Sequence, residues 1–132
     1  KLAAMKDFSV SAFYNRPAMP VTKTIFSCRN ISFLSGFNGI AIATSLSDVD
    51  ILLKSHNNSK KYLYLWDMEW LANPMAFSSV SNVLLDERLK IIARSKSHAS
   101  VIENFCNKKT IGIVDNWDLS QLLSLVVEEN YV

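Results

Sequence analysis

The sequence predicts an α/β protein, a three-layer Rossmann-like or flavodoxin-like domain with a mostly parallel sheet of four to six strands. Four short apolar runs, each followed by a polar pair, are the first observation. The runs are GIAIA, KYLYL, LKIIA and TIGIV, and the pairs are Thr44-Ser45, Trp66-Asp67, Arg94-Ser95 and Asp115-Asn116. The second observation is that three of the four runs lead into segments with helical periodicity. Buried strands that alternate with helices are typical of a parallel sheet.

The segment before residue 40 gives the weakest pattern. Residues 5–24 contain Pro17 and Pro20 and predict an extended or strand-like arm with a turn. Residues 25–28 form a candidate first strand, and residues 29–39 are expected to form a loop. The Asn38-Gly39 pair tolerates positive φ. It therefore also allows a hairpin between residues 31–34 and 40–43.

The first clear unit begins at residue 40, with a strand over residues 40–43. Ser45 or Ser47 is expected to cap a helix that ends at residues 56–59. Val49, Leu52 and Leu53 share one face of that helix. A second strand follows at residues 62–66, and an irregular stretch then leads to a short helix near residues 76–84.

The second half repeats the alternation, with strands predicted at residues 89–93 and 110–114. Ser95 or Ser97 is expected to cap the helix between them, and Asp118 caps a final helix. The side chains expected to face inward from the first of these helices are Val101, Ile102, Phe105 and Cys106. Those that form the apolar stripe of the final helix are Leu119, Leu122, Leu123, Val126 and Val127.

Composition indicates one globular domain. The chain has 132 residues, of which 49% are hydrophobic and 20% charged. Because its net charge is only +2, neither a nucleic-acid nor a membrane partner is expected. Residues 1–4 precede Met5 and are interpreted as vector sequence, which leaves residues 5–132 as a single domain. Cys28 and Cys106 are interpreted as two buried free thiols of a cytoplasmic protein.

The glycine count restricts the cofactors that the chain can bind. With three glycines, the sequence can form neither the dinucleotide fingerprint nor the P-loop, both of which need glycine-rich turns around phosphate. The cysteines have no metal-ligand spacing. We therefore expect no cofactor and no metal.

The candidate site lies where the strands end, because ligands of parallel sheets bind outside the carboxyl ends of the strands. Asp67, Glu69 and Asp115 are the candidate catalytic residues, since paired carboxylates can perform acid–base chemistry. The candidate ligand-binding residues are Trp66, Asp67, Arg94, Ser95, Asp115 and Asn116.

Each of these residues also has a structural interpretation. Trp66 and Trp70 would anchor the following loop, Arg94 would pair with Asp67 or Asp115, and Ser95 would cap a helix. His98 is expected at the surface, and His56 is expected to cap the end of a helix.

The second half of the chain resembles a known family. Residues 89–122, LKIIARSKSHASVIENFCNKKTIGIVDNWDLSQL, resemble the end of the N-terminal Rossmann-like domain of GT-B glycosyltransferases. The matching segments are IIARS at residues 91–95 and IVDNWD at residues 113–118. The string YLYLWDMEWL is similar to small glycosyltransferase-like proteins of large tailed phages.

The resemblance implies a glycosyltransferase-like domain. In this family a second, C-terminal domain binds the sugar donor, and we do not expect these 132 residues to contain it. The first expectation is therefore a protein-binding module, encoded by a phage and acting in the host cytoplasm on a protein partner or on its own copies. The alternative is an acceptor-binding lobe that works with another subunit or as a homo-oligomer. It would bind a nucleotide sugar or a sugar acceptor. A receiver-like nucleotide sensor ranks last.

Overall fold

The computed structural model describes residues 8–16, 26–56 and 59–131. The interpretation of residues 1–4 as vector sequence therefore lies outside the described residues. The strands are β1 (Ser11–Tyr14), β2 (Ser27–Asn30), β3 (Ile40–Ala43), β4 (Lys60–Leu65), β5 (Leu89–Ala93) and β6 (Thr110–Ile113). The α-helices are α1 (Leu46–Lys54), α2 (Phe77–Leu84), α3 (Lys96–Cys106) and α4 (Leu119–Tyr131). Three short 3-10 helices are η2 (Ile31–Gly36), η3 (Glu69–Leu71) and η4 (Pro74–Ala76).

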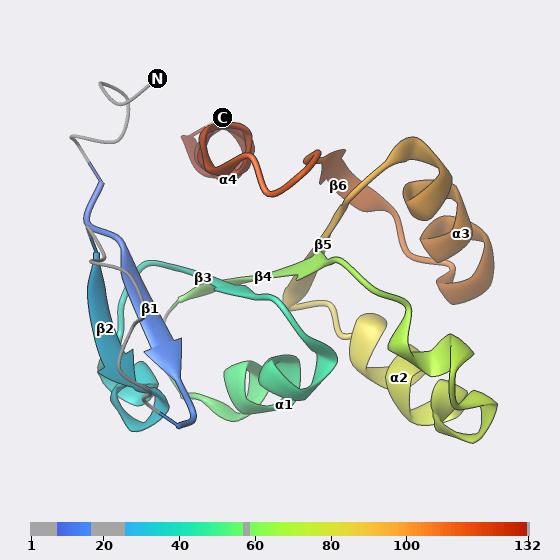
Figure 1. Ribbon diagram of the computed structural model, residues 1–132, viewed down its shortest axis with the longest axis horizontal. Coiled ribbons are helices and arrows are strands. Elements are labelled where there is room, and N and C mark those ends of the chain that lie inside the picture. The colour runs from blue at the N-terminus through green and yellow to red at the C-terminus, as the bar shows by residue number, and fades with distance from the viewer. Residues whose placement is uncertain (1–7, 17–25, 57–58, 132) are drawn as a thin grey trace.

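The main sheet has the order β3-β4-β5-β6, and every described pair in it is parallel. The predicted Rossmann-like α/β fold is thereby confirmed. Each strand lies beside the one before it, and the connections α1, α2 and α3 pack on the same face. This is the arrangement expected when successive right-handed crossovers move in one direction. Helix α4 lies on the opposite face, which completes three layers (Figure 1).

Alternation along the strands divides the core between the two faces. Leu63 and Leu65 of β4, with Ile91 of β5, belong to the core under α1, α2 and α3. Tyr62 and Tyr64 point to the opposite face, where Leu122 and Val126 of α4 cover them. Both sets are buried. The runs of residues 62–65 and 89–93 are continuously apolar or aromatic, apart from Lys90, because each strand is covered on both sides.

Polar contacts and one glycine bring α4 close to the sheet. Asn130 Nδ2 donates to the hydroxyl of Tyr62 at 3.0 Å, and Glu129 pairs with Lys90 of β5. Gly112 of β6 lies directly under Leu125, where an added Cβ would be 2.7 Å from both Leu125 δ-carbons. The absence of a side chain at residue 112 therefore permits the close packing of α4 on β6.

The N-terminal segments form a separate two-stranded sheet. Strands β1 and β2 pair in parallel, and Phe13 and Phe37 meet edge to face with ring centroids 5.5 Å apart. The first strand, which the sequence predicted at residues 25–28, is observed at Ser27–Asn30. Residue 25 itself lies outside the described residues.

The loop and the hairpin predicted before residue 40 are both wrong, because residues 31–36 form a 3-10 helix. The Asn30 side chain accepts a hydrogen bond from the Ser32 backbone N–H at 2.9 Å and so begins this helix.

Most of the predicted caps are confirmed, whereas several predicted burials are wrong. Ser45 and Ser95 cap α1 and α3, and Asp118 Oδ1 accepts hydrogen bonds from the first turn of α4. Phe105 and Cys28 are exposed, although both were expected inside. Phe105 lies three residues after Ile102 and one residue before Cys106. This position on the helix places its ring beyond the edge of the buried face.

Leu119 and His56 also differ from expectation. Leu119 is exposed at the first position of α4, before the helix reaches the sheet. The backbone N–H of Ser55 closes the end of α1 on the Ile51 carbonyl, so His56 is not the cap.

Replacing Gly112 with alanine should destabilise the protein by about 1–3 kcal/mol, because the new methyl group would overpack Leu125. Urea unfolding measures the change. Gly36→Ala is the matched control, since a Cβ there meets nothing within 4 Å. Equal stability of the two variants would contradict the close packing of α4 on β6.

Candidate functional site

Two indole rings meet at the carboxyl ends of the strands. Trp66 directly follows β4, and Trp117 lies in the turn after β6. Their ring centroids are 5.2 Å apart, with an interplanar angle of 34°. Asn116 and Trp117 both have left-handed backbone conformations, with φ of 49° and 57°. Such conformations are strained for residues other than glycine, by about 1–3 kcal/mol each, and they cluster at functional sites.

Tyr64 supports the two indoles from below. Its buried ring makes edge contacts with Trp117 at 4.7 Å and with Trp66 at 6.0 Å. The hydroxyl donates a hydrogen bond of 2.7 Å to the backbone carbonyl of Val114. Burial raises the pKa of Tyr64, and this effect exceeds the lowering by a backbone hydrogen bond from Trp117. The hydroxyl is therefore a proton donor at neutral pH, as this hydrogen bond requires.

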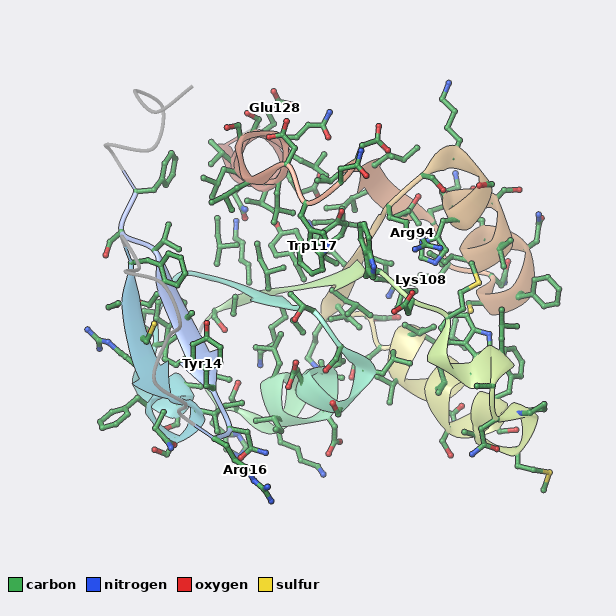
Figure 2. The ribbon with its side chains drawn as sticks, viewed as in Figure 1. Tyr14, Arg16, Arg94, Lys108, Trp117 and Glu128 are labelled. Carbon is green, nitrogen blue, oxygen red and sulfur yellow. The ribbon has the colours of Figure 1, made fainter. Side chains whose placement is uncertain are left out.

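Arg94 completes the group from the end of β5. Its Cζ atom lies 5.2 Å from the centre of the Trp66 ring, which is a cation–π distance. Its Nη1 atom lies 3.7 Å from Asp67 Oδ1. Of the two predicted partners, the ion pair with Asp67 is thereby confirmed. We call Trp66, Arg94 and Trp117 the aromatic platform; Figure 2 shows Trp117 and Arg94 near one another, well apart from Tyr14 of β1.

The other candidate residues have different surroundings. Ser95 Oγ accepts a hydrogen bond from the His98 backbone N–H at 3.2 Å, which is its capping role. Asp115 is exposed, and its backbone N–H donates to Gln121 Oε1 at 3.0 Å. Asn116 is the first of the two residues with left-handed backbone conformations after β6. Glu69 begins η3, and its side chain lies outside the described part of the structure. The structure thus brings together Trp66, Asp67 and Arg94, and adds Trp117.

His98 is buried, so its predicted surface position is wrong. Only 4% of the residue is exposed, and neither ring nitrogen has a hydrogen-bond partner among the described residues. Burial lowers the pKa of His98, and Arg94 lowers it further while Asp67 opposes the shift. The sequence spacing could have predicted this burial, because residues 98, 102 and 106 are four positions apart and share the buried face of α3.

A hollow of about 340 Å³ lies apart from the platform, between β1 and β3. Its wall includes Phe13, Phe37 and Leu52, and its polar lining includes Tyr14, Thr44 and Asp48. Sequence reasoning missed this region because it depends on where the first two strands lie. The polar pair Thr44-Ser45 after residue 43 could have indicated a site here, because Thr44 lines the hollow.

The described residues contain no group of three or more His, Cys, Asp or Glu side chains arranged to hold a metal ion. Within the same residues, every helix is too short or too polar to cross a membrane. Comparison with family models, curated proteins and solved structures found no match to this chain.

Removing both charges of the Arg94–Asp67 pair should change stability little. In the double variant Asp67→Ala/Arg94→Ala, the loss should be below about 1 kcal/mol, because the side chains are 69% and 42% exposed and solvent screens their attraction. Thermal and urea unfolding measure it. A loss above about 2 kcal/mol would identify a desolvated structural pair instead.

Replacing His98 with leucine should stabilise the protein increasingly as the medium becomes acidic. A lowered pKa in the folded state means that the unfolded chain binds a proton first. The wild type therefore loses stability as the pH falls below 6.5, the ordinary value for imidazole. Unfolding free energies of the two proteins across this range test the effect. His56→Leu, at an exposed position, is the control; an identical pH dependence in wild type and His98→Leu would contradict the burial of a neutral imidazole.

Proposed function

We propose that the domain binds a partner protein through the aromatic platform at the carboxyl ends of β4, β5 and β6. The observation that carries the proposal is the packing of Trp117, which is 48% exposed, against Trp66, whose ring also contacts Arg94. Tryptophan and arginine are the residue types most enriched among those that dominate binding energies. Side chains already held in place lose less conformational entropy when a partner docks.

The polar groups around the platform favour binding over catalysis. Arg94 is engaged with Asp67 and Trp66, and the Ser95 hydroxyl caps α3. Trp66 thus contacts both Arg94 and Trp117 at the place where a catalytic crevice was expected. The resemblance of residues 89–122 to GT-B glycosyltransferases supports a glycosyltransferase-like origin, encoded by a phage. Cys28 and Cys106 form no disulfide, which fits a place in the host cytoplasm.

The alternative is an acceptor-binding lobe of a glycosyltransferase that works with another subunit or as a homo-oligomer. The hollow between β1 and β3 favours this alternative, since it offers a concave space of the size that small ligands occupy. Under this alternative Asp67, Glu69 and Asp115 remain the candidate catalytic carboxylates.

Trp117→Ala should weaken partner binding strongly without unfolding the domain. Truncation of a central tryptophan should weaken binding by about 2 kcal/mol or more, about 30-fold. The test is quantitative capture of proteins from lysate of the host in which the gene is expressed, followed by titration of the captured partner. Phe105→Ala is the matched control, because Phe105 is also an exposed aromatic residue but lies on α3 outside the platform.

Light scattering on the same proteins separates a partner protein from self-association, because a dimer that dissociates only in Trp117→Ala would identify a second copy as the partner. Equal capture by wild type, Trp117→Ala and Phe105→Ala would contradict the proposal. A rise in melting temperature with uridine diphosphate glucose, and not with uridine, would instead support the acceptor-lobe alternative.

A further inference from the structure

We propose that the hollow between β1 and β3 binds a small, largely apolar ring compound that carries a hydroxyl or ammonium group. The inference assigns a ligand chemistry to a part of the molecule that the platform does not use. It holds whether or not the aromatic platform binds a protein, because the two regions share no residue.

The position of the hollow supports a ligand site. All four residues of β1 and all four of β3 line it, so β1 rather than β2 faces the main sheet. The strands therefore follow one another as β2, β1, the hollow, β3, β4, β5 and β6. Starting from β1, the chain proceeds outward to β2 in one direction and from β3 to β6 in the other (Figure 1). The hollow thus lies between the two sheets, and one end of it, at Tyr14 and Thr44, lies at the carboxyl ends of β1 and β3, which is where parallel α/β proteins bind ligands.

The walls of the hollow determine the main part of the ligand. Phe13 and Phe37 lie edge to face, and Ile31, Leu34 and Leu52 add aliphatic surface. The volume of about 340 Å³ lies at the lower end of the range for ligand pockets. A ring compound of modest size with an apolar body fits this lining.

Polar groups mark one end of the hollow. Tyr14 ends β1, Thr44 follows β3, and Asp48 lies in the first turn of α1. Asp48 Oδ2 accepts a hydrogen bond from Ser45 Oγ at 2.7 Å, and Oδ1 has no partner among the described residues. A half-buried carboxylate with a free oxygen accepts a hydrogen bond from a hydroxyl or ammonium group and repels an anion. The polar end therefore selects against acids.

Three probes of one shape test this selectivity: 2-phenylethylamine, 2-phenylethanol and phenylacetate. Each is titrated to millimolar concentration while amide shifts are recorded by nuclear magnetic resonance. The amine and the alcohol should perturb the amides of Phe13, Ala43 and Asp48, with the amine binding more tightly. Phenylacetate should not bind there.

Asp48→Asn should weaken binding of the amine about tenfold, the loss expected for a hydrogen bond to a charged group, and should change binding of the alcohol much less. Asp50→Asn is the matched control, because it removes the same charge from the same helix at a side chain that is 57% exposed. Ala12→Leu, which fills the hollow, should abolish binding of both probes. Thr44→Val removes a hydroxyl from the polar end of the hollow at an exposed position, and it should weaken binding of the probes if Ala12→Leu fails to fold.

Four outcomes would overturn the inference. The first three are no binding of any probe at millimolar concentration, equal binding of the amine and phenylacetate, and equal loss of amine binding in Asp48→Asn and Asp50→Asn. The fourth is a set of shifts confined to Trp66 and Trp117, since these would place the ligand on the platform. Failure of this test leaves the partner-capture result unaffected, so the two proposals are distinguishable.

Discussion

The hydrogen bond from the Tyr64 hydroxyl to the Val114 carbonyl is the interaction on which the aromatic platform depends. Tyr64 lies in β4 and Val114 follows β6, so the bond joins two strands that are separated by β5. Both groups are buried, and each would cost free energy if it had no partner. The bond fixes where β6 ends, and the left-handed residues Asn116 and Trp117 then return the chain over Tyr64.

The sheet separates two potential binding regions. Because β3 to β6 follow one another in order, their crossover helices occupy one face and α4 covers the other. The platform uses residues that follow β4, β5 and β6, whereas the hollow uses β1 and β3. Under the two proposals, the domain would bind a protein at the platform and a small molecule at the hollow.

The parts of the fold that the sequence predicted are those governed by local chemistry. Residues 40–43 and 89–93 are short buried runs, and Ser45, Ser95 and Asp118 are typical capping residues next to periodic segments. The pairing of β1 with β2 was not predicted, since parallel pairing joins residues far apart in the sequence. Trp66, Asp67 and Arg94 were predicted from their place at strand ends. The position of Trp117 depends on two left-handed residues, and a tryptophan gives no signal of that conformation.

The most direct test of the account is a comparison of wild type and Tyr64→Phe by nuclear Overhauser contacts between the rings of Trp66 and Trp117. In wild type these contacts should be present. In Tyr64→Phe the fold should persist with a loss of about 1–3 kcal/mol, because the Val114 carbonyl loses its partner, and the contacts between the indoles should weaken or vanish. Absence of contacts in wild type, or unchanged contacts in Tyr64→Phe, would contradict the claim that this hydrogen bond builds the platform.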